Sequence, residues 1–290
     1  MQHRVHTDQS CNSWRHLPFE EGAIDTSMGH ASTTAKSAFE EQVDAASAAT
    51  KTDIKALPLT HVTDWAGFIA ISKDGQFASK KPCPVYGKPL VYAFYGRPAY
   101  RLRDDGLSHS LPTFSPVCFV LRADLIKSAE RMMPFDSGGF SMYAAAMHPS
   151  LTLADYELTV GTASTTRVVS FFWGSNADYY GTKFLDSLTI GPAAVALTHY
   201  YSLISNKLST VFDNRCSTIE LQFPSPLQLT GIIDAIIVPS GVAGSEAATI
   251  ASSLNAELLT YEFEMPYKIS DFHVSIRTVV RDFLLSRGIL

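Results

Sequence analysis

The stretch Thr218-Ile219-Glu220-Leu221-Gln222-Phe223 alternates polar and apolar side chains, which is typical of a β-strand. The alternation places Glu220 on the same face as Thr218 and Gln222, with the three apolar residues on the opposite face. In the ordinary interpretation of such a strand, the carboxylate lies on the solvated face of a half-buried sheet. Whether Glu220 has a further role depends on the segments around it.

The composition indicates a globular chain. Its 290 residues are 46% hydrophobic and 11% aromatic, enough for one large hydrophobic core or two smaller ones. We find no run of about 18 uncharged apolar residues, as a membrane span requires, and no apolar secretory signal at the N-terminus. We therefore expect a soluble, cytoplasmic protein without membrane contact. The cysteines form no Cys-x-x-Cys pair and are expected to be reduced thiols; they are Cys11, Cys83, Cys118 and Cys216.

Charge is distributed unevenly along the chain. The formal net charge of −5 argues against a general nucleic-acid coat protein, which needs dense Lys and Arg. Residues 73–103 nevertheless contain seven basic residues and one acidic residue, Asp74. This stretch is either a solvated basic face or a region that attracts an anionic ligand. Its basic residues are Lys73, Lys80, Lys81, Lys88, Arg97, Arg101 and Arg103.

Composition also divides the chain into two parts. Residues 1–55 are rich in Ser, Thr, Ala, Gln and acidic residues and have few large apolar residues, which predicts a flexible N-terminal tail. Within it, Phe39 and Val43 lie one helical turn apart, so residues 34–48 could form a single helix. From residue 56 to residue 290 the apolar content stays high, and we predict one folded domain there.

Inside residues 56–290, short strand patterns alternate with helical patterns, which predicts an α+β fold. Strands are expected at residues 57–63, 90–95, 117–121, 166–173, 218–223, 232–238 and 257–263. Helices are expected at residues 64–74, 180–188, 193–206, 245–254 and 271–286. Asp64 suits the N-cap of the first helix, and the Asp74-Gly75 turn signal suits its end.

Several familiar catalytic motifs are absent. The sequence has no G-x-x-x-x-G-K-[ST] loop and no G-x-G-x-x-G after a strand, which argues against P-loop and Rossmann nucleotide sites. The nine histidines are scattered, so we expect no bound metal. Asp136-Ser137-Gly138-Gly139 looks like the nucleophile loop of trypsin-like serine proteases, but the matching Thr-Ala-Ala-His-Cys segment is missing. We interpret this tetrapeptide as an ordinary turn.

Three further segments occur in an order that resembles ADP-ribosyltransferase folds. Pro58-Leu59-Thr60-His61-Val62-Thr63-Asp64-Trp65 resembles the opening strand of the His-containing branch of that fold. Lys88-Pro89-Leu90-Val91-Tyr92-Ala93-Phe94-Tyr95-Gly96-Arg97-Pro98-Ala99-Tyr100 resembles a strand and turn of DarT-type DNA ADP-ribosyltransferases. Thr218-Ile219-Glu220-Leu221-Gln222-Phe223-Pro224 is similar to the strand that carries the catalytic Glu in that family. The resemblance covers the order of these segments over about residues 56–240, and residues 102–213 have no counterpart in it.

The resemblance implies a split β-sheet core with flanking helices and a catalytic domain over residues 56–290. It also implies a mono-ADP-ribosyltransferase, in which NAD is the substrate and ADP-ribose passes to a macromolecule. A DarT-like acceptor is nucleic acid, and a protein acceptor stays open. A toxin or phage-defence role follows from the same resemblance, and an antitoxin or other inhibitory partner is expected because a toxin needs restraint.

The resemblance and the chemistry together name the candidate catalytic residues. Cleavage of the nicotinamide bond passes through an oxocarbenium-like ribose, so Glu220 is expected to bind a ribose hydroxyl and to take the acceptor's proton. The planar guanidinium of Arg97 suits the NAD pyrophosphate or an acceptor phosphate. The residues expected to contact NAD are His61, Thr63, Tyr92, Tyr95 and Thr218.

Tyr92 and Tyr95 lie three residues apart, on opposite faces of a strand, so only one of them can stack on nicotinamide. Tyr95 is preferred because it is nearer Arg97.

Each candidate also has a structural interpretation. His61 could be a hydrogen-bonded core histidine, Arg97 could cap a turn, and Thr218 could satisfy local backbone groups. Two other functions stay open. With water as the acceptor, the same site is an NAD glycohydrolase, and without catalysis it is a nucleotide-binding or interaction module.

Overall fold

The computed structural model describes residues 35–47, 54–79, 81–100, 102, 107–186, 188–205 and 214–290. The strands in these residues are β1 Leu59–Asp64, β2 Gln76–Phe77, β3 Leu90–Tyr95, β4 Pro116–Leu121, β5 Arg131–Met133, β6 Glu220–Pro224, β7 Leu227–Gln228, β8 Ile233–Pro239 and β9 Glu257–Tyr261. The α-helices are α1 Ala38–Ser47, α2 Trp65–Asp74, α3 Phe140–Tyr143, α4 Thr162–Trp173, α5 Asn176–Gly181, α6 Val195–Ser205, α7 Ser245–Ser253 and α8 Phe272–Ser286.

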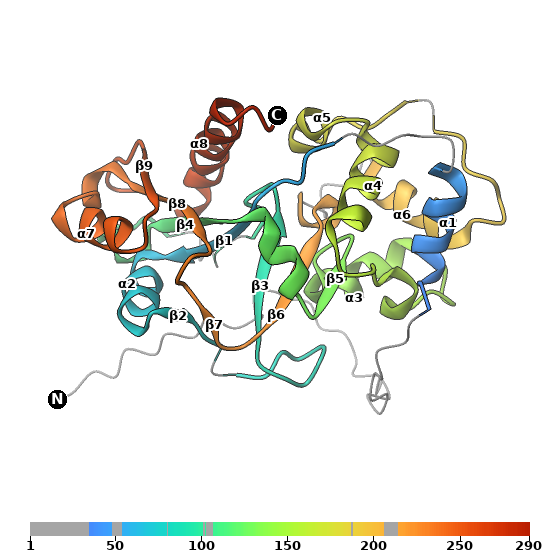
Figure 1. Cartoon of the computed structure of the whole chain (residues 1–290), viewed down its shortest axis with the longest axis horizontal. Coiled ribbons are helices and arrows are strands. Elements are labelled where there is room, and N and C mark those ends of the chain that lie inside the picture. Colours follow the sequence, from blue (N-terminus) through green and yellow to red (C-terminus); the bar gives the residue numbers. More distant parts are fainter. Residues whose placement is uncertain are drawn as a thin grey trace.

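Seven of these strands form one mixed sheet in the order β5-β6-β3-β1-β4-β8-β9, while β2 and β7 pair separately. Neighbours in the large sheet are antiparallel except β8 and β9, which are parallel. Apart from α5 and α8, the helices flank this sheet in two groups (Figure 1): α2 and α7 lie beside the β8–β9 end, and α1, α3, α4 and α6 gather at the β5–β6 end. The predicted α+β class is confirmed. No helix in the described ranges is long and apolar enough to cross a membrane.

Most predicted elements appear close to their expected bounds because local signals specify them. Helix α2 begins after Asp64, whose Oδ1 accepts a hydrogen bond from the Gly67 N–H at 2.6 Å. It ends at Gly75, whose φ of 66° is left-handed and whose N–H donates to the Ile71 carbonyl.

The predicted strand at residues 166–173 is wrong, because these are the last eight residues of helix α4. Residues 168–173 are all buried, so this part of the helix shows no polar face to reveal a helical period. Its Thr, Val and Phe residues are also strand formers in isolation. The predicted helix at residues 180–188 is displaced: α5 ends at Gly181 because Thr182 adopts a left-handed φ of 57°.

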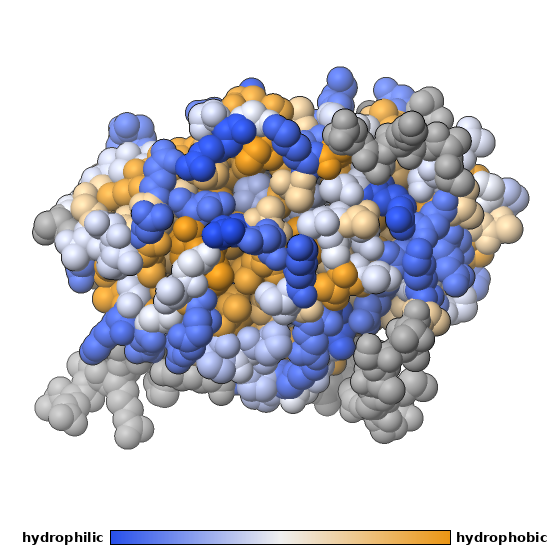
Figure 2. All heavy atoms as spheres, viewed as in Figure 1, coloured by the Kyte–Doolittle hydropathy of each residue, from blue (hydrophilic) through white to orange (hydrophobic). Residues whose placement is uncertain are grey.

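The large sheet is weakly joined in its middle. Strands β1 and β3 pair at two positions, Leu59 with Tyr95 and Thr60 with Phe94, whereas β1 pairs with β4 along all six of its residues. The pairing therefore stops after Thr60, and the sheet divides into the halves β5-β6-β3 and β1-β4-β8-β9. Figure 2 shows hydrophobic residues in the middle of the molecular face that is turned toward the viewer, with hydrophilic residues around them. In Figure 1, which has the same orientation, this area corresponds to the region of β1, β3 and β7.

Helix α1 lies within the predicted flexible tail, yet it packs into the core. The Phe39 ring is fully buried, and its centroid lies 5.0 Å from that of Tyr200 and 5.6 Å from that of Tyr156. The neighbouring Glu40 carboxylate is buried too, and it accepts hydrogen bonds from Thr159 N at 2.9 Å, Thr159 Oγ1 at 2.6 Å and Ser164 Oγ at 2.6 Å. Residues 38–47 therefore belong to the folded body. The rest of the predicted tail, residues 1–34 and 48–53, lies outside the described residues.

Replacing Glu40 by Ala is expected to lower the free energy of unfolding by about 2 kcal/mol, because it leaves buried hydrogen-bond donors without an acceptor. Glu41, next to it on α1, is exposed, and Glu41→Ala is expected to change stability by less than about 0.5 kcal/mol. Urea unfolding of both variants checks the prediction. Equal effects would mean that α1 does not depend on its buried carboxylate.

Candidate active site

Glu220 lies at the start of β6 in the half-sheet β5-β6-β3. It stands opposite Phe94 of β3 and Met133 of β5, so these three side chains share one face of the sheet. Its side chain is 1% exposed. The ordinary interpretation, a solvated carboxylate on an outer face, is therefore wrong, and the buried charge needs specific partners.

Two side chains donate hydrogen bonds to Oε1 of Glu220. Ser137 Oγ lies 2.7 Å away and Gln222 Nε2 lies 2.7 Å away. Gln222 is two residues along the same strand, so strand geometry points it to the same face. Arg131 Nη1 donates to the amide oxygen of Gln222 at 3.0 Å, which turns the amide nitrogen toward Glu220. The carboxylate is thus held by a network that spans β5, β6 and the turn after β5.

Arg131 and Tyr86 cover this network. The guanidinium carbon of Arg131 lies 3.9 Å from the centroid of the Tyr86 ring, and Arg131 Nε donates to Glu157 at 3.3 Å. Burial raises the pKa of Tyr86 to about 12, and the charge of Glu220 acts in the same direction. The Tyr86 phenol is therefore neutral and faces the carboxyl group.

Asp136 lies against Glu220. Burial, first, and then the charge and hydrogen bonding of Asp136 raise the pKa of Glu220 well above its ordinary value of 4.5, while Gln222 and Ser137 act against this rise. Asp136 Oδ2 lies 3.8 Å from Arg215 Nη1, and Oδ1 accepts from the Gly138 N–H at 3.0 Å. The site therefore contains two carboxyl groups between two arginines, Arg131 and Arg215.

The raised pKa of Glu220 makes stability depend on pH. Between 4.5 and its raised pKa, the folded chain holds a proton that the unfolded chain has released, so stability falls as pH rises through this window. Glu220→Gln removes this proton, and we expect the variant to gain stability relative to the wild type as pH rises from 4.5 to the raised pKa of Glu220, with a limiting slope of about 1.4 kcal/mol per pH unit. Urea unfolding at several pH values measures it. A pH-independent difference in stability between the two proteins would contradict a raised pKa for Glu220.

Arg97 follows β3 and is also buried, with 1% exposure. Its Nη2 donates to the Ser217 carbonyl oxygen, and its guanidinium carbon lies 4.1 Å from the centroid of the Tyr179 ring. Its Nε and Nη1 are buried and have no hydrogen-bond partner among the described residues. No acidic side chain within those same ranges forms an ion pair with it. A buried guanidinium in this state is suited to an anion that brings the missing acceptors.

The backbone before Arg97 turns sharply. Gly96 has a φ of 67°, and a Cβ at this position would lie 2.5 Å from Leu57 Cδ1, so a side chain does not fit. The turn aims Arg97 at the 3₁₀ turn Asn214–Ser217, which precedes β6. Arg97 thus ties the end of β3 to the start of the Glu220 strand.

The residues predicted on β1 do not meet Glu220. Thr60 shares the face of Phe94 and Glu220, so the alternation of β1 turns His61 and Thr63 to the opposite face. His61 Nδ1 donates to the Tyr92 carbonyl oxygen at 2.8 Å, and its ring packs on Phe77. Burial lowers the pKa of His61, which keeps it neutral. This geometry matches the structural interpretation of His61, as a hydrogen-bonded histidine that is partly buried.

The two tyrosines of β3 occupy opposite faces, as their spacing predicts. Tyr92 stands opposite Gln222 and therefore shares the face of Glu220. Tyr95 is fully buried, and its hydroxyl accepts from the Leu57 N–H at 2.9 Å. The geometry thus favours Tyr92, not Tyr95, as the ring nearer the site. Thr218 is buried as well, and its Oγ1 donates to the Asn214 carbonyl oxygen at 2.6 Å. This contact matches the structural interpretation of Thr218, in which its side chain satisfies a local backbone group.

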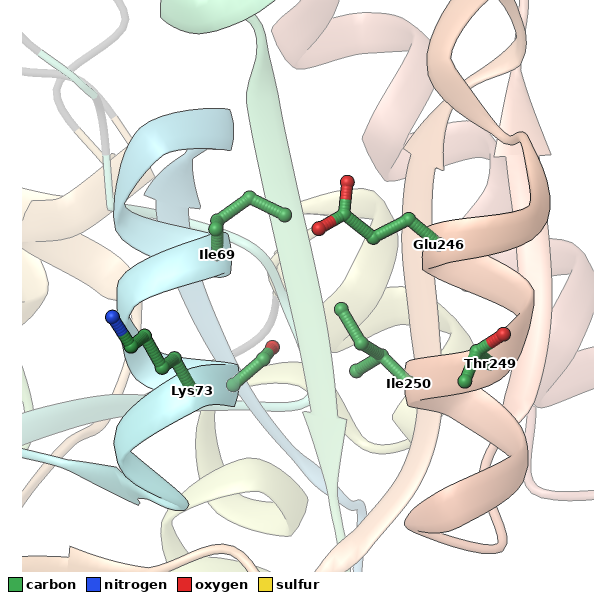
Figure 3. A pocket seen from close by; sticks show the side chains of 6 residues that line it. Ile69, Lys73, Glu246, Thr249 and Ile250 are labelled. Carbon is green, nitrogen blue, oxygen red and sulfur yellow. The ribbon is translucent and has the colours of Figure 1, made fainter.

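Two surface hollows lie elsewhere. One, of about 400 Å³, lies between α2 and α7 (Figure 3); there Ile69 and Glu246 point toward each other across the gap, with Ile250 beside them. The other, of about 570 Å³, lies between α5 and α8 and includes Arg277 and Arg281. Neither is lined by Glu220. In the part of the chain that the structure describes, no three His, Cys, Asp or Glu side chains gather in a metal-binding group.

Sequence reasoning missed the turn at residues 136–139 as part of the site. The turn interpretation itself is confirmed, since Ser137–Gly139 forms a 3₁₀ turn capped by Asp136. Ser137 contacts Glu220, which lies 83 residues later in the chain, and no local sequence pattern indicates a contact over such a separation. No family model, curated protein or solved structure matches the chain.

Proposed function

We propose that this protein cleaves the N-glycosidic bond of NAD and transfers ADP-ribose to a macromolecular acceptor, with Glu220 as the reacting carboxylate. The observation that carries the proposal is the pair of buried charges on one half-sheet. Glu220 is held by two donors, and Arg97, three residues beyond its cross-strand partner Phe94, has unsatisfied N–H groups. Buried charges in perturbed environments cluster at functional sites, which supports a ligand-binding role for both groups.

The arrangement of strands supports the ADP-ribosyltransferase-like split sheet expected from the sequence. The three segments that resemble this fold lie on β1, β3 and β6, which are neighbours in the sheet. The pairing of β1 with β3 is limited to two positions, so the sheet opens between the first and second of these segments.

The chemistry assigns a role to each charge. The bond between ribose C1′ and the nicotinamide nitrogen breaks, and its electron pair leaves with nicotinamide. The new bond forms between C1′ and an acceptor oxygen or nitrogen, whose proton passes to Glu220. Arg97 neutralises the pyrophosphate through the N–H groups that lack partners.

NAD glycohydrolysis is a second candidate, and the burial of Glu220 favours it. The Glu220 side chain is 1% exposed, so the covering segment with Tyr86 must move before any acceptor reaches it, and a water molecule needs a smaller movement than a bulky acceptor. For the transferase, the resemblance favours nucleic acid as the acceptor, in a cytoplasmic toxin or phage-defence role with an inhibitory partner. A protein acceptor is the alternative.

Incubation with NAD labelled in its adenylate part, together with DNA, RNA or protein, tests these functions. Label bound to one macromolecule identifies the transferase and its acceptor. Release of free ADP-ribose with equal nicotinamide identifies the glycohydrolase. If NAD stays intact under all conditions, both enzymatic proposals are overturned, and a nucleotide-binding or interaction module is the remaining function.

A further inference from the structure

The turn after β5 brings a second carboxyl group to Glu220. Asp136 N donates to the Arg215 carbonyl oxygen at 3.0 Å, and Asp136 Oδ1 accepts from the Gly138 N–H at 3.0 Å. These two contacts fix the turn at both ends, and the next residue, Ser137, donates to Glu220 Oε1 at 2.7 Å. These contacts hold Asp136 within the turn, and the hydrogen bond from Ser137 joins this turn to Glu220.

We propose that Asp136 is a positioning residue for Glu220, and that the two carboxyl groups share one proton and together carry one negative charge. Two neighbouring carboxyl groups, of which Glu220 is fully buried and Asp136 is 15% exposed, cannot both be ionised without an energetic penalty. The surrounding groups suit a single negative charge, because Arg215 lies 3.8 Å from Asp136 and Arg131 reaches Glu220 through Gln222.

The titratable and charged groups around the pair come from four places. Tyr86 faces it from the segment before β3, Arg131 from β5, and Arg215 from the 3₁₀ turn before β6. Glu157 forms an ion pair with Arg131 on the outer side of Arg131, and 39% of the Glu157 side chain is exposed. Tyr86 stays neutral, so the two arginines set the charge balance of the pair.

The role of the shared proton in catalysis depends on the proposed function. A pair with one negative charge can accept the proton that leaves the acceptor when the C1′ bond forms. The pair then holds two protons and returns one to solvent after the products leave. The reaction consumes NAD and the acceptor and yields the ADP-ribosyl product, nicotinamide and one proton.

Urea unfolding as a function of pH tests the shared proton without NAD. The wild type is expected to lose stability as pH rises through the raised pKa of Glu220. Asp136→Asn removes the neighbouring charge, so this loss is expected to move to lower pH, while the Asn side-chain oxygen still accepts from Gly138. Glu220→Gln is expected to abolish the loss, and the double variant to behave as Glu220→Gln does.

Two results would overturn the inference. In the first, Asp136→Asn leaves the pH of this stability loss where the wild type has it. In the second, the double variant shows an additional pH-dependent change, so that Asp136 acts independently of Glu220. Asp155→Asn is the matched control, since Asp155 also caps a short 3₁₀ helix, by accepting from Thr152 N at 2.7 Å, and it is expected to leave the pH of this loss unchanged.

The pH profile of NAD cleavage is the second readout. Asp136→Asn is expected to move the ionisation of Glu220 in this profile to lower pH, whereas a purely structural role would lower the rate equally at every pH. Absence of NAD cleavage by the wild type would contradict the proposed function and leave the unfolding result to decide the carboxyl pair.

Discussion

Glu220→Gln is expected to slow NAD cleavage by about 10³-fold, because a positioned acid–base group contributes about 10² to 10⁴ in rate. The amide keeps the size of the side chain, and its oxygen can still accept from Ser137 and Gln222, the donors seen at 2.7 Å. It cannot take a proton from the acceptor. Nicotinamide release, followed at saturating NAD, measures the effect on the chemical step and not on binding.

The control for this variant is Glu257→Gln on β9. Glu257 is exposed and forms a surface ion pair with Arg287 at 3.0 Å, so its loss is expected to leave the rate unchanged. Glu220→Gln should also remain folded, since the substitution replaces a buried carboxyl group with a neutral amide of the same size. A Glu220→Gln rate within about threefold of the wild type would exclude Glu220 as the proton acceptor.

Arg97→Met is expected to weaken NAD binding by about 10²-fold or more, because two charge-assisted hydrogen bonds to the pyrophosphate are lost. In the wild type, NAD at about 100 times its Kd is expected to raise the free energy of unfolding by about 2.7 kcal/mol, and this gain should disappear in the variant. Thermal or urea unfolding with and without NAD measures it. Met fills a similar volume beside Tyr179, so the variant itself should fold.

Arg97→Lys separates charge from geometry at this position. Lys keeps the positive charge but lacks the planar fork, so it is expected to recover only part of the binding. Arg122→Met is the surface control, because Arg122 is exposed and pairs with Asp124 at 2.8 Å. If Arg97→Met binds NAD as tightly as the wild type, the unsatisfied N–H groups of Arg97 do not face the ligand.

Local signals in the sequence predicted much of the sheet. Alternating polar and apolar residues specify β6, and continuous apolar runs specify β4 and β8, because each strand buries one or both faces. The Asp64 cap and Gly75 likewise specify α2. Helix α4 escaped prediction because it is buried along most of its length, which removes the polar face that reveals a helix.

Patterns of neighbouring residues are enough to predict the class of fold, most of the strands and a carboxylate on β6, because these features depend on residues a few positions apart. The burial of Glu220, its contact with the turn that contains Asp136 and Ser137, and the position of His61 on the other face of the sheet depend on the packing of distant segments. Strand order and register join segments about 80 residues apart, and the burial that raises the pKa of Glu220 exists only once those segments are packed together.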